Sequence, residues 1–234
     1  MNAEPSTQGQ RAAASLLDWW LDAGVDVAVS EEARDWLGRK PAAIAPITAA
    51  EADTPKPSDL GGFREWLSIG SGLPLDGPGA IRIAPHGDEN APVMLISDLP
   101  GREDAADGRP IGGEAWALTG KMLAAIGMSA NDVYSASLAC FHAPGAKIGR
   151  AELDQCAAIA RDHVRLAKPQ RLILFGDAPS RALLGEPLAR ARGRVHKVEG
   201  VRTIATFHPR WLLQRPSDKA LAWRDLLLLM SEEQ

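Results

Sequence analysis

Two loops of the sequence carry the residue types most suited to chemistry. Asp98 stands in Ser-Asp-Leu-Pro-Gly-Arg-Glu-Asp, an acidic loop punctuated by Pro and Gly, and His208 stands in Thr-Phe-His-Pro-Arg-Trp near the other end of the chain. A carboxylate and an imidazole can transfer protons and stabilise developing charge. A purely structural role for Asp98 remains open, because an Asp before Pro-Gly can close an Asx-turn or cap a helix.

Alternating buried strands and amphipathic helices must position these loops. Short apolar runs predict strands, and apolar residues at helical spacing predict the helices between them. The predicted strands are 93–96, 133–138, 172–175 and 203–207, and the predicted helices are 114–126, 150–166, 178–184 and 219–230. Strict alternation favours parallel strands, which need crossover helices. We therefore expect a three-layer α/β/α fold with a central parallel sheet of four strands.

Ligands of such sheets bind at the carboxyl ends of the strands. This rule selects the segment Asp98–Gly101, Ser137, the pair Gly176 and Asp177, and the pair His208 and Pro209. Asp98 and His208 are thus expected to face each other across one cleft.

The N-terminal part of the chain differs in composition from the rest. Residues 1–37 show helical periodicity, with Leu16, Leu17, Trp20 and Leu21 on one stripe, and residues 38–59 are rich in Ala and Pro without periodicity. We expect an N-terminal helical segment over 1–37, a linker over 38–59 and the main domain over 60–234.

Composition limits the classes of function. The 234 residues carry a net charge of -4, contain no run long enough for a membrane helix, and lack a secretory signal pattern, which favours a cytoplasmic protein. Two cysteines are too few for a disulfide framework or a four-thiolate metal site. The basic run Arg190, Arg192, Arg194, His196 and Lys197 can contact DNA phosphates or can be a solvated loop. His163 lies on the apolar stripe of its helix, where a packed histidine is the default expectation.

Several of these motifs, in this order and spacing, resemble those of bacterial family 4 of the uracil-DNA glycosylase superfamily. They are Asp98–Asp104, Pro110–Gly113, Leu183–Gly185, Arg192–His196 and the His208 loop through Leu213. The segment Leu17–Asp26 resembles the leader of longer proteobacterial members.

The resemblance implies a DNA glycosylase that flips a damaged base out of the duplex and hydrolyses its N-glycosidic bond. It assigns a cation-stabilising or water-orienting carboxylate to Asp98 and a hydrogen-bond donor to His208. It also places Leu212 as the wedge that enters the vacated base stack. The implied base pocket comprises Leu99, Pro100, Gly101, Ile111 and Ser137, and the implied DNA contacts are Arg192, Arg194, Pro209, Arg210 and Leu212. The expected partner is DNA with a damaged base, and the expected state is a monomer.

The sequence departs from the family at the base pocket. Ile111 occupies the position of a stacking Phe, and Ser137 that of an Asn that reads the uracil edge. Two other functions therefore remain open: a lesion-binding protein that has lost catalysis, and an α/β protein that acts on another nucleobase.

The sequence also departs from the family at its iron-sulfur cluster. Cys156 matches one cluster ligand and Cys140 lies one residue before another, but the stretch 63–92 has no cysteine. We expect no cluster, with both thiols in the apolar core and with packing by Phe63, Trp66 and Leu67 in the cluster's place.

Overall fold

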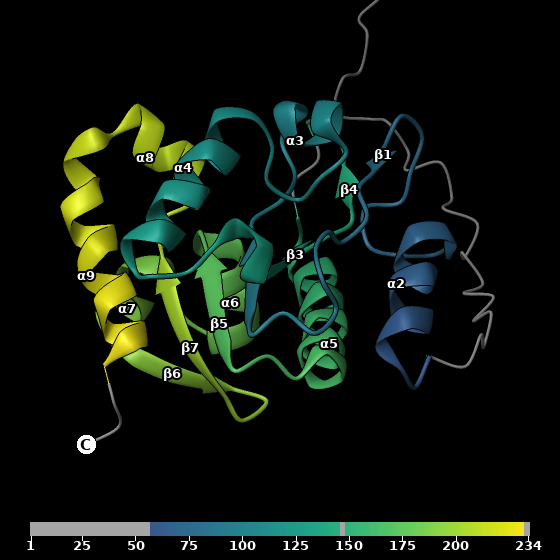
Figure 1. The fold of residues 1–234 in the computed structure, drawn as a ribbon. Helices are drawn as coiled ribbons and strands as arrows, with labels where there is room; N and C mark the ends of the chain where they lie inside the picture. Colours follow the sequence, from purple (N-terminus) through teal and green to yellow (C-terminus); the bar gives the residue numbers. More distant parts are fainter. Residues whose placement is uncertain (1–56, 146–147, 232–234) are drawn as a thin grey trace, which may run out of the picture. The chain divides into compact units, whose positions relative to one another are not determined.

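The computed structural model describes residues 57–145 and 148–231, which belong to one compact unit, Pro55–Gln234 (Figure 1). The predicted helical segment 1–37 and most of the predicted linker 38–59 lie outside the described residues. The first described helix, α2 (Leu60–Ile69), begins where the Asp59 carboxylate accepts a hydrogen bond from the Gly62 amide at 2.8 Å. No described helix combines the length and the apolar character needed to cross a membrane.

A five-stranded sheet forms the centre, in the order β3-β2-β5-β7-β6. Its parallel members are the four predicted strands, β2 (Val93–Ser97), β3 (Val133–Ser137), β5 (Arg171–Phe175) and β7 (Val201–Thr206). The prediction of four strands missed β6 (Val195–Val198), which pairs antiparallel with β7 at the sheet edge. Glu199 and Gly200 join the two strands at φ 49° and 81°, the positive values that tight hairpin turns require.

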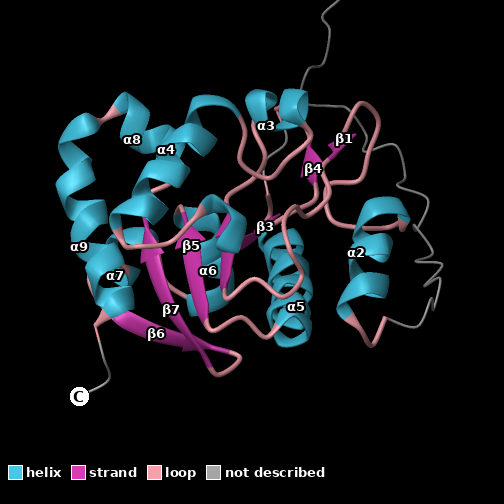
Figure 2. Cartoon of the chain, in the orientation of Figure 1, coloured by secondary structure: helices cyan, strands magenta, loops and turns pink. Residues whose placement is uncertain are grey.

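Helices cover both faces of this sheet (Figure 2). Met94 and Ile96 of β2 point to the face of α5 (Arg150–Ala167), α6 (Asp177–Leu184) and α7 (Leu188–Ala191). Val93 and Leu95 point to the opposite face, which α4 (Gly113–Ala125) and α9 (Lys219–Met230) cover. The predicted three-layer α/β/α class is confirmed, with helix bounds within one residue of those predicted.

Smaller elements surround this core. They are α3 (Arg102–Asp107), α8 (Pro209–Gln214), the 3₁₀ turns η1 (Ala130–Asp132) and η2 (Pro216–Asp218), and a two-stranded antiparallel sheet of β1 (Ile81–Arg82) and β4 (Phe141–His142). A separate apolar cluster joins α2 to this small sheet, through Phe63, Leu67, Leu73 and Phe141, with Trp66 and Cys140 packed against it. Phe63 and Leu67 are buried in this cluster, and Trp66 packs against it.

The strand register brings the site loops together. Ser97 pairs with Ser137 on one side and with Phe175 on the other, and Phe175 pairs with Thr206. The four strands therefore end at one level, and the residues that follow them emerge at the same edge.

Candidate active site

Asp98 and His208 line one cleft at the carboxyl edge of the sheet. The cleft has a volume of about 500 Å³, within the usual range for a ligand site. Its lining consists of residues that follow β2, β5 and β7 together with part of α7: Asp98, Gly176, Asp177, Leu188, Ala189, Arg192, Phe207, His208 and Trp211. The two residues that the sequence singled out therefore share a concave surface, although more than a hundred residues separate them.

Asp98 is held against the start of α6. Its Oδ1 accepts a hydrogen bond from the Leu99 amide at 2.8 Å, and Gly176, the N-cap of α6, packs against its carboxylate. A Cβ on Gly176 would lie 2.6 Å from Asp98 Oδ2, and Gly176 has φ 106°, so glycine is required there for space and for conformation. Burial raises the pKa of Asp98, against the lowering effects of the Leu99 amide and Arg210.

His208 presents a neutral imidazole. Burial, and next the Arg210 guanidinium, lower its pKa to about 3. Its Nδ1 accepts from the Arg210 amide at 3.1 Å and so caps α8, whereas the Arg210 guanidinium lies 3.5 Å from Nε2. Both contacts come from donors of Arg210 and a neutral imidazole can accept only one of them; the shorter contact, to Nδ1, is the better hydrogen bond. Nε2 then carries the hydrogen and can donate to a ligand.

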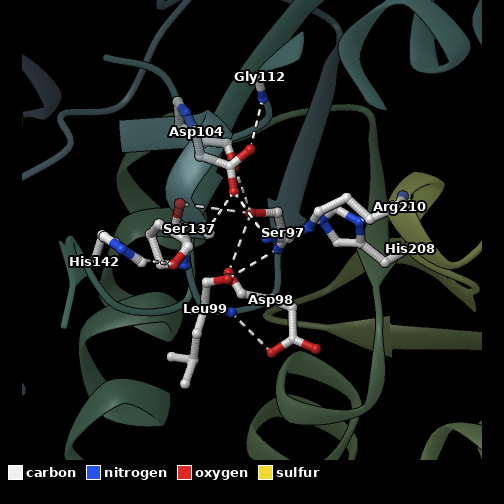
Figure 3. Close-up of polar contacts among 12 residues, drawn as sticks. Ser97, Asp98, Leu99, Asp104, Gly112, Ser137, His142, His208 and Arg210 are labelled. Carbon is white, nitrogen blue, oxygen red and sulfur yellow. Dashed lines mark hydrogen bonds and ion pairs between the residues drawn. The ribbon is translucent and has the colours of Figure 1, made fainter. Parts of the chain in front are cut away.

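Asp104 ties three loops of the site together (Figure 3). Its buried carboxylate accepts from the Gly101 and Gly112 amides, each at 2.7 Å, and lies 3.2 Å from Arg210 Nη1. Arg210 Nη2 in turn donates to the Leu99 carbonyl at 3.0 Å. A Cβ on Gly101 would lie 2.0 Å from Arg210 Nη1, so the glycine provides the space for this guanidinium. The network fixes the Asp98 loop relative to the His208 loop.

Arg192 forms part of the cleft wall. Its Nη2 donates to the buried carboxylate of Asp225 at 2.8 Å, and that carboxylate also accepts from Thr206 Oγ1 at 2.8 Å. The guanidinium carbon lies 4.4 Å from the centre of the Phe207 ring. Arg192 Nε is the only buried side-chain nitrogen or oxygen of the described residues that has no hydrogen-bond partner.

The predicted base-pocket residues divide into two groups. Leu99, Pro100 and Gly101 belong to the loop that the Asp104 network holds, where the Pro100 carbonyl accepts from His142 Nδ1 at 2.8 Å. None of the five predicted base-pocket residues is among those that line the cleft. Ile111 is buried in the core under α4, and Ser137 is half-buried with its hydroxyl 3.5 Å from that of Ser97.

Three of the predicted DNA contacts are engaged within the protein. Leu212 is 1% exposed and packs from α8 against α4 and α9. In this structure its side chain is therefore not available for insertion into DNA. Arg210 and Arg192 pair with the buried carboxylates Asp104 and Asp225. Arg194 is exposed and pairs with Glu186, and Pro209 is the buried first residue of α8.

Sequence reasoning missed Asp104, His142, Asp225 and Trp211. Asp104 and Asp225 look like ordinary helix-surface carboxylates in sequence, and only the fold brings them to their arginine partners. One signal was available for Trp211: a large aromatic ring next to the His-Pro dipeptide, at a strand end where ligands bind.

Both cysteines pack in apolar clusters, Cys156 in the main core and Cys140 beside Phe141. Cys156 is buried in α5, and burial raises the pKa of its thiol to about 12 and that of the Cys140 thiol to about 11. Across residues 57–145 and 148–231, no three His, Cys, Asp or Glu side chains are grouped so that they could hold a metal ion.

Comparison with known proteins agrees with this architecture. The chain is similar to the type-4 uracil-DNA glycosylase of Archaeoglobus fulgidus, with 26% identity over 141 residues that cover 56% of this chain and 71% of the relative. It is also similar to the type-4 uracil-DNA glycosylase of Pyrobaculum aerophilum, with 25% identity over 154 residues that cover 61% and 79%. Residues 84–227, more than half of the chain, match the profile of the Uracil DNA glycosylase superfamily. The chain therefore belongs to the uracil DNA glycosylase superfamily.

Proposed function

We propose that the protein is a DNA glycosylase of base excision repair, which hydrolyses the N-glycosidic bond of uracil or a related damaged base. The observation that carries the proposal is the shared cleft, in which the Asp98 carboxylate and the His208 imidazole lie at the strand ends. Membership of the superfamily and the names of the two relatives support it.

The two side chains suit the two charges of this reaction. The bond from the sugar C1′ to the base breaks with its electron pair going to the base, and His208 Nε2–H donates a hydrogen bond to the resulting anion. The Asp98 carboxylate stabilises the oxocarbenium-like sugar and orients the water whose oxygen bonds to C1′. The proton that this water releases neutralises the departing base. A neutral imidazole can donate its Nε2–H in a hydrogen bond without transferring the proton to the base.

An assay for abasic sites in uracil-containing single- and double-stranded DNA tests the proposal. We expect Asp98→Asn to slow excision roughly 10²- to 10⁴-fold and His208→Ala roughly 10²- to 10³-fold. The absence of product with the wild type, or undiminished product with the double variant, would rule the function out.

A second function, binding of damaged DNA without catalysis, is favoured because none of the five predicted base-pocket residues lines the cleft. It predicts tight, salt-sensitive binding to DNA with no turnover. A panel of deaminated and alkylated bases in the same assay distinguishes uracil excision and binding without catalysis from action on a different nucleobase.

We further propose that the chain functions without the iron-sulfur cluster of its family. A four-thiolate cluster does not fit, because the whole chain has two cysteines. The apolar cluster around Phe63, Leu67 and Phe141 would provide the packing instead. We expect the Cys140→Ala, Cys156→Ala double variant to fold and excise like the wild type; iron that co-purifies with the wild type and is lost in this variant would contradict the proposal.

We propose the following setting for this activity. The chain is a bacterial, family-4-like protein that acts as a cytoplasmic monomer on DNA with a damaged base, and residues 60–234 form its catalytic domain. The family-like motifs and the leader-like segment Leu17–Asp26 support this setting.

A further inference from the structure

A row of two aromatic rings flanked by two guanidinium groups begins in one wall of the cleft, which Arg192, Phe207 and Trp211 line, and ends at Arg215. Phe207 and Trp211 are nearly parallel, with an angle of 10° between their planes and 6.5 Å between their centres. The Arg192 guanidinium lies 4.4 Å from the centre of Phe207, and the Arg215 guanidinium lies 4.5 Å from that of Trp211. We refer to Arg192, Phe207, Trp211 and Arg215 as the aromatic row.

The row is held in place although part of it is open to solvent. Trp211 is 40% exposed, yet its indole Nε1–H donates to Asp218 Oδ2 at 2.8 Å, while Asp225 anchors Arg192. An exposed aromatic ring with a fixed orientation loses little conformational entropy when it binds a ligand. The row is therefore organised before any ligand arrives.

The chemistry of the row matches an unpaired nucleotide. Parallel rings with centres 6.5 Å apart overlap little, which leaves ring surface free to contact another flat group. The exposed Arg215 guanidinium at one end attracts phosphates, whereas Arg192 at the other end is paired with Asp225 and supports Phe207. Aromatic rings beside positive charge are the usual means of binding single-stranded nucleic acid.

The row is continuous with the proposed catalytic residues, because Phe207 and Trp211 line the same cleft as Asp98 and His208. We propose that Trp211, supported by the rest of the row, stacks an unpaired base that neighbours the excised nucleotide on the same DNA strand. This inference rests on the proposed function, and it gives Trp211 the DNA-contacting role that the sequence assigned to Leu212. It implies a preference for single-stranded or locally unpaired DNA.

Binding of a labelled single-stranded oligothymidylate to the full chain tests the inference without requiring catalysis. At fixed low salt we expect Trp211→Ala to weaken binding roughly 5- to 150-fold, the range for loss of one base stack, and Trp211→Phe to weaken it much less. Trp223→Ala is the matched control, since Trp223 is 39% exposed and lies in a different groove, on α9. We expect it to bind like the wild type.

An oligonucleotide of abasic sites separates bases from phosphates as the ligand. It retains the phosphates but has no bases, so we expect wild type and Trp211→Ala to bind it equally. The inference is overturned if the wild type does not bind oligothymidylate, if Trp211→Ala binds it as tightly as the wild type, or if Trp223→Ala or the abasic strand shows the same loss. Slower uracil excision by Trp211→Ala with unchanged oligothymidylate binding also overturns it, because the ring would then contact the excised base. Failure of the proposed function has a different signature, namely no abasic product from the wild type.

Discussion

The carboxylate of Asp104 and the guanidinium of Arg210 lie 3.2 Å apart and join the two loops that carry the proposed catalytic residues. Asp104 is fully buried, and the Arg210 side chain is 29% exposed. Removal of one partner leaves a charge without its counter-charge in a poorly solvated place, which is far more costly than loss of an exposed pair.

We therefore expect Asp104→Asn and Arg210→Gln each to lower the free energy of unfolding by about 3 kcal/mol. The double variant should lose clearly less than the sum of the two, because the partners interact directly. Urea denaturation of the four proteins measures this coupling. Arg165→Gln is a suitable control, since Arg165 is 62% exposed in its pair with Asp162 and should contribute less than about 1 kcal/mol. Additive losses for Asp104 and Arg210 would show that the pair is not coupled.

The sequence was sufficient to predict the four parallel strands and the main helices. Each is a local pattern of apolar residues, and the buried runs Val93–Ser97 and Arg171–Phe175 have no competing interpretation. β6 was missed because Val195–Val198 is a short edge strand with an exposed Lys, whose pattern matches that of a basic loop.

The candidate site could be predicted only in part. Asp98 and His208 follow predicted strands, so the parallel-sheet rule was enough to place them together. The arginines could not be placed in this way, because the sequence does not say whether a guanidinium faces solvent or a buried carboxylate. The side-chain direction of Leu212 depends likewise on how α8 packs against α4 and α9.

The loss of excision activity at acid pH should reflect protonation of Asp98 and not of His208. Activity needs an ionised Asp98 and a neutral His208. The pKa of Asp98 is raised, and that of His208 is lowered to about 3. We expect kcat/KM to fall as the pH drops through the pKa of Asp98, above the ordinary value of 3.8, with no separate step from His208 near 6.5. In Arg210→Gln the acid limb should move to higher pH, because Arg210 lowers both pKa values. A step near 6.5 that is present in the wild type and lost in His208→Ala would mean that His208 titrates normally.

The ionised Asp98 should reduce the stability of the fold. Its pKa is higher in the folded protein than in the unfolded chain, so the folded state binds more protons and loses stability as the pH rises through this interval. Asp98→Asn should therefore unfold at higher urea concentration than the wild type at pH 7, with a smaller difference near pH 4. Asp154→Asn, at an exposed position on α5, provides the control. Equal midpoints for Asp98→Asn and wild type at pH 7 would contradict a destabilising carboxylate.

Truncation of Leu212 and of its neighbour Leu213 should affect the stability of the fold to very different extents. Leu212 is 1% exposed and Leu213 is 37% exposed. Leu212→Ala should lower the free energy of unfolding by about 2–5 kcal/mol, as other large-to-small core substitutions do, whereas Leu213→Ala should have little effect. Below the unfolding transition, the affinity of Leu212→Ala for DNA should equal that of the wild type. A selective loss of affinity for damaged duplex DNA in this variant would restore Leu212 as the wedge.

The two glycines that flank α6 separate backbone strain from crowding of Asp98. Gly176 and Gly185 both have positive φ, 106° and 75°, so alanine is strained at either position. A Cβ at position 176 would also lie 2.6 Å from Asp98 Oδ2, whereas at position 185 no atom lies within 4 Å. Both variants should therefore lose about 1–3 kcal/mol of stability, but only Gly176→Ala should also displace the carboxylate and slow excision. Excision rates on a uracil-containing single strand, measured where both variants are fully folded, distinguish the two effects. Equal rates would indicate that the position of Asp98 is not critical, because the Gly176 side of the cleft would then tolerate a methyl group without any effect on catalysis.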